Sequence, residues 1–571
     1  MRYKQKSMTR DEYEYFLQVT AGEVKAELVL KNANFLDVFT NRFKSGDIAI
    51  SSGTFAGIGK YSGAQEIDMT GKTIVPGFID AHIHIESTTV VPEIFVKESI
   101  KHGTTAVITD PHEIANVMGV DGINYMLEAT EGLPMDVFFM IPSCVPSCKY
   151  DEAGAVIMAS DMEQFYGRDR VKGMAELMDV DGVVSRNPSV LDKSYSAIKK
   201  DMLIDGHAPM VTGRKLVSYI AAGVLSDHEC ASLEEALEKM GLGVWIMIRE
   251  GTAAQNLADL IGLCQEPYAS RSMFCTDDRH INHIMDEGHI DAIIRKAIKL
   301  GADPAIAYKM ASYNAAAYFG LRDRGAISPG FLADFIVLED INDARVGAVY
   351  KNGIEITDEA LKLKCKSHIT DDLIEKSHDT FHLPFITEEM LGNKGKLPII
   401  GLVPGQLYTT REGLSDGINI DQDILKVAVV ERHNNTGHIG IGFVNGYGMK
   451  KGAIATSVAH DAHNIIAIGA SEKDMAHAIN ALKDIGGGMV VWADGKVKAS
   501  YPLPVAGLMS EESSDMTKKH LEEIHLAAYE LGANKDIDPF MTLSFTALPV
   551  IPELRITTKG VVDVASGKIF K

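Results

Sequence analysis

Two histidines, His82 and His84, stand one residue apart at the end of the apolar run IVPGFIDAHIH. If this run is a β-strand, residues two apart point to the same face, so the two imidazoles lie side by side. Imidazole nitrogens are common ligands of divalent transition metals. The pair therefore indicates a strand that ends in a metal chelate.

Other polar side chains end or interrupt further apolar runs in the same part of the chain. Nitrogen and oxygen donors in this number suit one or two divalent ions of the zinc, manganese or iron type. These polar side chains are Glu176 in GMAELM, His207 after DMLIDG, His228 after GVLSD, and Asp277 and Asp278 after SMFCT.

Each of these residues taken alone has a simpler structural use. A lone histidine is more often hydrogen-bonded in a core or loop, and Glu176 could be a buried carboxylate with a backbone donor. Asp277 or Asp278 could cap the helix that follows. Unrelated structural uses would not all fall at the same end of five strands, so together these residues favour a metal site.

The elements that must position these residues repeat one pattern between about Gly71 and Gly320. Eight short apolar runs alternate with amphipathic helical stretches, which is typical of parallel strands joined by crossover helices. Their number and spacing predict an α/β fold with a (β/α)₈ TIM-like barrel, in which the carboxyl ends of the strands carry the chemistry. The alternative, a doubly wound open sheet, usually has a glycine-rich turn where this chain has His82-Ile83-His84.

The regions around the barrel have a different character. Stretches before and after it read as short strands with turns, and they predict one small composite β-sandwich domain built from both ends. Strands and one helix near the end of the chain predict a separate α+β domain. The expected domains are 1–72 and 323–380 for the two parts of the small β domain, 73–322 for the barrel and 381–571 for the C-terminal α+β domain.

The amino-acid composition limits the classes of binding partner and the cellular compartment that we expect for this protein. Lys and Arg number 56 against 78 Asp and Glu, a net charge of −22, which argues against nucleic acid or an anionic membrane surface as the main partner. The six cysteines show no disulfide-framework spacing, which favours a reducing compartment. With no signal-peptide core and no membrane span in the sequence, we expect a cytoplasmic protein.

The sequence resembles the amidohydrolase superfamily. The resemblance is carried by VPGFIDAHIH on strand one, single histidines on strands five and six, the strand-eight aspartate, and the segment from Asn314 to Glu339. Within the superfamily it is closer to the adenine deaminase family, through stretches such as TTAVITDPHEIANVMG, AELMDVDGV, FCTDDRH, VAHDAHNIIAIG and YPLPVAGLMS.

This resemblance implies hydrolytic deamination of adenine to hypoxanthine and ammonia, for purine salvage. It also implies two divalent metal ions per subunit, Mn²⁺ or Fe²⁺ with Zn²⁺ as a further option. In that reading His82 and His84 hold one metal, His207 and His228 hold the second, Glu176 bridges them, and Asp277 is a metal ligand that also transfers a proton. Superfamily members with two metals often bridge them with a carboxylated lysine on strand four. The segment GMAELM contains no lysine, but its glutamate, Glu176, already supplies two oxygens. We also expect a homo-oligomer, a dimer or higher.

The expected catalytic residues are Asp277, Glu176 and His228, and the expected substrate-binding residues are His112, Glu113 and Asp278. Glu113, Asp278, Glu229 and Glu250 are all candidates for the acid that protonates the leaving amine, and the sequence does not choose among them. A further cluster in the last domain, His460, Asp461, His463 and Asn464, could bind metal, although a structural role is favoured.

Two other function classes stay open at this point. One is a different amidohydrolase that acts on another aminopurine or on a cyclic amide. The other is a catalytically inactive scaffold, which usually loses metal ligands, whereas all six expected ligands are present here.

Overall fold

Eight parallel strands form the centre of the molecule in this computed structural model, which describes residues 8–365, 367–392 and 395–571. Strands β6 to β10 pair in sequence order, and so do β11 to β13. The backbone amide of Leu225 donates to the carbonyl of Ile204 between the two groups, and a parallel bridge between Ile83 and Asp277 joins the last strand to the first. The (β/α)₈ barrel expected from the sequence is confirmed. Its strands are β6 (Phe78–Ile83), β7 (Thr104–Thr109), β8 (Asp136–Ile141), β9 (Val171–Leu177), β10 (Leu203–Gly206), β11 (Ser226–Asp227), β12 (Trp245–Arg249) and β13 (Ser272–Cys275).

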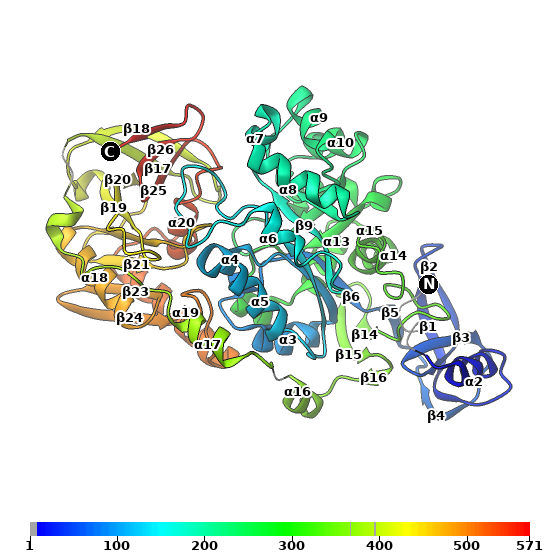
Figure 1. Ribbon diagram of the computed structural model, residues 1–571. Helices are drawn as coiled ribbons and strands as arrows, with labels where there is room; N and C mark the ends of the chain where they lie inside the picture. Colours follow the sequence, from blue (N-terminus) through cyan, green and yellow to red (C-terminus); the bar gives the residue numbers. More distant parts are fainter. Residues whose placement is uncertain (1–7, 366, 393–394) are drawn as a thin grey trace.

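Helices follow the strands and cover the outside of the barrel (Figure 1). Their starts are encoded locally: the Ser232 side chain accepts the amide of Glu235 at one start, and Asn187 caps another that has proline at its first position, both common N-terminal signals. The helices named here are α3 (Pro92–Ser99), α4 (His112–Met118), α5 (Val120–Ala129), α8 (Pro188–Lys199), α9 (Gly213–Ala221), α10 (Leu233–Gly241) and α13 (Ile290–Lys299).

The small β domain is one connected eight-stranded sheet built from the chain segments that come before and after the barrel in the sequence. Strand β14 pairs antiparallel with β5, with Phe335 opposite Pro76 and Leu338 opposite Thr73. Residues 1–7 of the predicted N-terminal segment lie outside the described residues. The strands are β1 (Ala26–Asp37), β2 (Arg42–Ser51), β3 (Thr54–Gly59), β4 (Gly63–Asp68), β5 (Thr73–Pro76), β14 (Phe335–Asp340), β15 (Arg345–Lys351) and β16 (Ile354–Glu355).

The C-terminal region is an α+β domain, as expected from its sequence. Its main sheet has eight strands in the order β18-β17-β20-β19-β22-β21-β23-β24, and β25, β26 and β27 form a second, three-stranded sheet. These strands are β17 (Leu397–Leu402), β18 (Thr409–Ser415), β19 (Leu425–Val430), β20 (Ile439–Asn445), β21 (Ala453–Thr456), β22 (Ile465–Gly469), β23 (Gly488–Ala493), β24 (Lys496–Pro502), β25 (Leu554–Thr557), β26 (Gly560–Asp563) and β27 (Lys568–Phe570).

Helix α18 (Glu472–Asp484) packs on the main sheet through Met475, Ile479 and Leu482, which share one helical face. Helices α19 (Ser514–Glu530) and α20 (Pro539–Phe545) follow the sheet along the chain.

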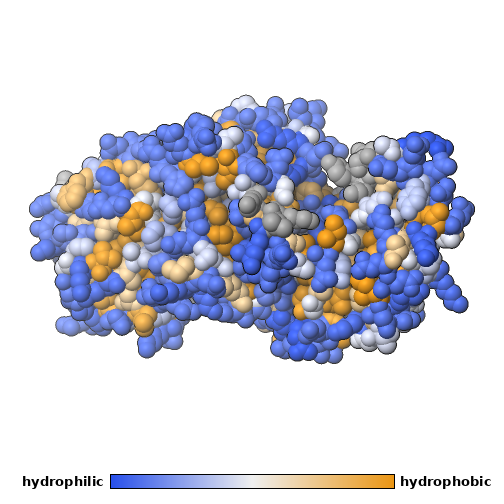
Figure 2. All heavy atoms as spheres, turned by 90° about the horizontal axis from the view of Figure 1, so that it is seen from below, coloured by the Kyte–Doolittle hydropathy of each residue, from blue (hydrophilic) through white to orange (hydrophobic). Residues whose placement is uncertain are grey.

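The C-terminal domain packs directly against the barrel (Figure 1). A parallel bridge joins Val90 to Ser510, and the Tyr501 hydroxyl donates to the backbone carbonyl of Thr89 at 3.1 Å. The face of the molecule in Figure 2 is mostly hydrophilic with scattered hydrophobic side chains. None of the described helices combines the length and the apolar character that a membrane crossing requires.

Candidate metal centre and active site

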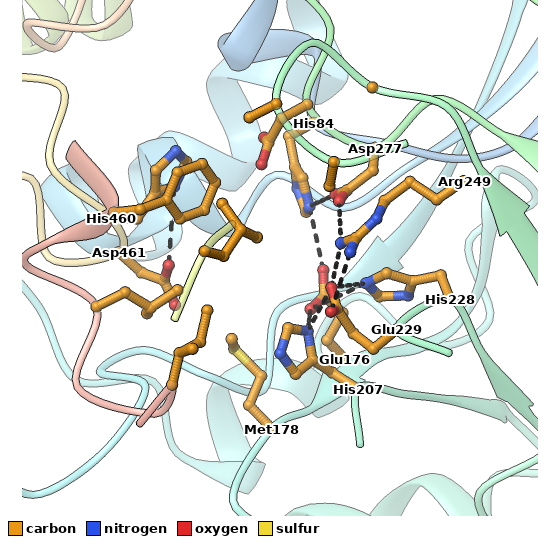
Figure 3. A pocket seen from close by; sticks show the side chains of 18 of the residues that line it. His84, Glu176, Met178, His207, His228, Glu229, Arg249, Asp277, His460 and Asp461 are labelled. Carbon is orange, nitrogen blue, oxygen red and sulfur yellow. Dashed lines mark hydrogen bonds and ion pairs between the residues drawn. The ribbon is translucent and has the colours of Figure 1, made fainter. Parts of the chain in front are cut away.

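The side chains at the carboxyl ends of the barrel strands converge on one buried point (Figure 3). Each of them is at least nine-tenths buried. They come from five different strands or the residues just after them, as parallel strands closed into a barrel require. They are His82 and His84 from β6, Glu176 from β9, His207 after β10, His228 after β11 and Asp277 after β13.

One half of the cluster surrounds the Oε1 atom of Glu176. The Nε2 atoms of His82 and His84 each lie 3.1 Å from that oxygen and 3.2 Å from each other. The Oδ1 atom of Asp277 lies 3.5 Å from Nε2 of His82 and 3.1 Å from Nε2 of His84. Two imidazoles and two carboxylates therefore converge at one point.

The other half surrounds the Oε2 atom of the same carboxylate. Nδ1 of His207 lies 2.9 Å from this oxygen, and Nε2 of His228 lies 3.7 Å from it. Glu176 thus directs its two oxygens to two different pairs of histidines. The second half also includes Glu229, whose Oε1 lies 3.6 Å from Nδ1 of His207 and 3.5 Å from Nε2 of His228.

This donor set fits divalent metal ions. The backbone carbonyl of Asp110 accepts a hydrogen bond from Nδ1 of His84 at 2.9 Å, so the proton sits on Nδ1 and the Nε2 lone pair is free to bind a metal. Glu176 Oε1 and His207 Nε2 are buried and have no hydrogen-bond partner among the described residues. Buried polar atoms rarely lack partners, and a cation between Glu176 and the His82 and His84 rings would supply one for Oε1.

The electrostatics of the cluster keep its carboxylates ionised. Burial by itself raises the pKa of Glu176, but the nearby His228 charge and the close contacts with His207, His82 and His84 outweigh burial and hold that pKa well below its ordinary range. Asp277 behaves in the same way: its pKa lies well below the ordinary value because the histidines and Arg249 outweigh burial. Both groups are therefore anionic at neutral pH, as carboxylate ligands of a metal would have to be.

Arg249 is a functional residue that the sequence reasoning missed. It ends β12 in WIMIR, and its guanidinium contacts both Glu229 and Asp277. Nη2 donates to Oε2 of Glu229 at 3.1 Å, and Nη1 donates to Oδ2 of Asp277 at 2.8 Å. A cation at the end of an otherwise apolar barrel strand was the available signal.

The structure also separates the candidates for the acid that protonates the leaving amine. Glu250 is not among the described residues that line the catalytic cavity; its Oε1 accepts the Leu257 amide at 2.8 Å and its Oε2 contacts Lys296. Glu250 is therefore the least suited of the four candidates, because β12 ends at Arg249 and the next side chain leaves the barrel rim. Both carboxylate oxygens of Glu229 accept hydrogen bonds from the Arg249 guanidinium.

The three expected substrate-binding residues, His112, Glu113 and Asp278, all line the cavity. His112 donates from Nδ1 to Oδ2 of Asp110 at 2.8 Å, and its ring lies 4.3 Å from that of His84. The Ser87 hydroxyl donates to Asp278. Burial and the Asp277 charge raise the pKa of Asp278.

Glu113 instead faces the C-terminal domain. Its carboxylate contacts His460, with 2.9 Å between Oε1 and Nδ1, and it also contacts Nε2 of His463. These two histidines belong to the cluster noted in the sequence. Asn464 points elsewhere, because its side-chain amide donates to the carbonyl of Glu152 at 2.8 Å.

A cavity lies in front of the cluster and is lined by both domains. Barrel residues form one side of it. His460, Asp461 and Phe545 of the C-terminal domain lie on the opposite side (Figure 3).

Comparison with known proteins agrees with this architecture. Residues 73–356 match the amidohydrolase family, and residues 408–568 match the adenine deaminase C-terminal domain. The adenine deaminase of Desulfatibacillum aliphaticivorans is 45% identical over 553 residues, which cover 95% of this chain and 96% of the relative. This chain belongs to the adenine deaminase family.

A second member of the family, the adenine deaminase of Clostridium acetobutylicum, is 44% identical and covers 97% of this chain and 99% of its own length. Family membership therefore includes the C-terminal domain that faces the cavity. Among solved structures, N-acetyl-D-glucosamine-6-phosphate deacetylase from Mycobacterium smegmatis covers 58% of this chain at 16% identity with a TM-score of 0.45.

Proposed function

We propose that this protein is a metal-dependent aminohydrolase that converts adenine and water to hypoxanthine and ammonia. The observation that carries the proposal is the position of Glu176, whose two oxygens face two separate histidine pairs in front of the cavity. The family relatives that match along nearly the whole chain bear the name adenine deaminase.

Two divalent ions per chain are proposed, manganese or iron, with zinc as a further option. His82, His84 and Asp277 would hold one ion, His207 and His228 would hold the other, and Glu176 would bridge them. When bound, such ions lower the pKa of water towards neutrality and so make a hydroxide nucleophile available at neutral pH.

Asp277 is the proposed proton carrier of the reaction. Its Oδ2 is held by Arg249 at 2.8 Å, which leaves Oδ1 directed towards His84 and the centre of the cluster. A carboxylate in this position can accept the proton of the attacking water and deliver it to the reacting base. Glu176 and His228, as proposed metal ligands, would define the end of the site where the attacking water binds.

The leaving amine has to be protonated before it departs as ammonia. Asp278 and His112 are the proposed groups near the leaving amine, since both line the cavity and the other candidate acids, Glu113, Glu229 and Glu250, are paired with cationic side chains. Asp278 is favoured as the acid because burial and the Asp277 charge raise its pKa, so that it holds a proton more readily than an ordinary aspartate.

The test is an ammonia-release assay on purified protein, in metal-free form and after addition of Mn²⁺ or Fe²⁺. The panel contains adenine, 2,6-diaminopurine, guanine and a cyclic amide such as dihydroorotate, with His82→Ala as the negative control. Metal-dependent turnover that is highest with adenine supports the proposal. Turnover only with another aminopurine or with the cyclic amide would assign the chain to the alternative amidohydrolase activity. A homo-oligomeric assembly and a cytoplasmic location stay predictions.

A further inference from the structure

The wall of the cavity that faces the proposed metal ligands comes from the C-terminal domain. His460 and Asp461 lie in the segment between β21 and β22, and Phe545 ends α20. The His460 ring stacks on Phe545 with 4.5 Å between ring centroids and 16° between planes. In Figure 3 His460 and Asp461 lie across the cavity from Glu176, His207 and His228.

Asp461 is an unusual residue within this wall. It is 2% exposed and lines the cavity, and its Oδ2 atom has no hydrogen-bond partner among the described residues. Burial raises its pKa to about 6. Oδ1 of Asp461 lies 3.8 Å from Nδ1 of His460, so within the described ranges only Oδ2 lacks a partner. A buried carboxylate oxygen without a hydrogen bond costs free energy, which a ligand that donates a hydrogen bond to Oδ2 would offset.

His460 supplies a donor beside this acceptor. Burial lowers its pKa, but the charges of Glu113 and Asp278 raise that pKa to about 9, so the ring is an imidazolium at neutral pH and carries two N–H groups. One of them, on Nδ1, contacts Glu113 at 2.9 Å. No hydrogen bond joins the other, on Nε2, to any residue in the described part of the chain.

The adjoining group of Glu113, His460 and His463 could in principle hold a metal. The backbone amide of Ala459 donates to Nδ1 of His463 at 3.2 Å, which places the proton of a neutral His463 on Nε2. Nε2 donates this proton in a hydrogen bond to the Glu113 carboxylate, so Nε2 has no lone pair for a metal. The group is a hydrogen-bonded latch that fixes the wall against the barrel.

Adenine has the complementary pattern on the edge far from its reacting carbon. When C6 lies at the hydrolytic end of the cavity, the edge with N3 and N9 faces the opposite wall. In the free base N9 carries a hydrogen and N3 a lone pair, so this edge offers one donor beside one acceptor. A nucleoside has a sugar on N9 and offers no donor there.

We propose that Asp461 is a specificity-determining residue that accepts the N9–H of a free aminopurine while His460 donates to N3. The inference rests on the proposed deaminase function and narrows its substrate class to free bases. A nucleoside or an N9-alkylated base would leave the Asp461 carboxylate buried against an alkyl group, and sites built around a substrate N–H strongly reject analogues that lack it.

The experiment compares wild type, Asp461→Asn and Asp461→Ala in steady-state assays with adenine and 9-methyladenine at matched metal content. A hydrogen bond to a charged group contributes about 1.5–3 kcal/mol, so the KM for adenine should rise about 10- to 100-fold in Asp461→Asn, with kcat within about threefold. In Asp461→Ala the preference for adenine over 9-methyladenine, measured as the ratio of kcat/KM values, should fall at least tenfold.

Asp151→Asn is the matched control. Asp151 is a buried carboxylate whose pKa is raised by burial and by the Asp461 charge, but it is not among the described residues that line the catalytic cavity. This variant should keep the wild-type KM and the wild-type preference for adenine.

Two results would overturn the inference while the proposed function stands: an unchanged KM and preference in both Asp461 variants, or equal effects in Asp151→Asn. A wild type that releases no ammonia from adenine would instead refute the proposed function. If the Asp461 variants do not fold, inhibition of the wild type decides: purine should inhibit at least tenfold more strongly than 9-methylpurine, and equal inhibition rejects the inference.

Discussion

Arg249 holds one oxygen of Asp277 and leaves the other directed into the metal cluster. Nη1 lies 2.8 Å from Oδ2, while Oδ1 lies 3.1 Å from Nε2 of His84. The guanidinium thereby orients the carboxylate that the proposed mechanism uses to move a proton. It also balances the charges of two buried acids, since Glu229 contacts its other side.

Asp277→Asn should reduce turnover of adenine by about 10²–10⁴-fold, the usual contribution of a general acid–base group. Asparagine keeps the hydrogen-bonding shape but cannot take the proton of water, so adenine should still bind. Asp278→Asn should lower turnover as well, by less than Asp277→Asn, because asparagine cannot protonate the leaving amine. Steady-state kinetics of both variants at matched metal occupancy test this; an active Asp277→Asn beside an inactive Asp278→Asn would exchange the two roles.

Arg249→Met should lower both stability and activity. Removing one partner of a buried ion pair typically costs about 3–5 kcal/mol, because the remaining charges stay buried without compensation. Arg249→Lys keeps the charge but loses the two-pronged contact, so it should recover stability more than turnover. Chemical unfolding and kcat of both variants measure the difference; a Met variant as stable as wild type would show that the ion pairs contribute nothing.

His82→Ala and His84→Ala should each lose bound metal and activity while the barrel stays folded. Wild-type protein should hold close to two metal equivalents per chain after reconstitution. Elemental analysis, circular dichroism and ammonia release on the same samples provide the test. Full turnover in either variant would remove that histidine from the ligand set.

Glu176→Gln should reduce metal occupancy more than it reduces the thermal stability of the metal-free protein. Glutamine keeps the volume of the side chain but removes the charge that would bridge two cations. The comparison is metal content against the melting temperature of the apo form. A large fall in apo melting temperature with normal metal binding would make Glu176 a structural partner of the histidines instead.

The barrel and the position of its polar strand ends could be predicted because both depend on short-range patterns. Alternation along a strand places His82 and His84 on one face, and parallel strands in a barrel bring their carboxyl ends to one rim. Glu176 could be singled out for the same reason, as a carboxylate in an apolar run. These features are determined by neighbours a few residues away.

Contacts between distant segments are what only the tertiary structure decided. Glu113 and His463 are 350 residues apart in the chain, and no local pattern encodes which surface of the C-terminal domain meets the barrel. The same packing brings Asp461 to the cavity and buries it without a partner among the described residues. The contacts of Arg249 also depend on tertiary packing. Its partners Glu229 and Asp277 come from the strands on either side of it and meet only when the barrel forms. Burial and pairing are properties of that closed packing, so the second wall of the site had to come from the folded molecule.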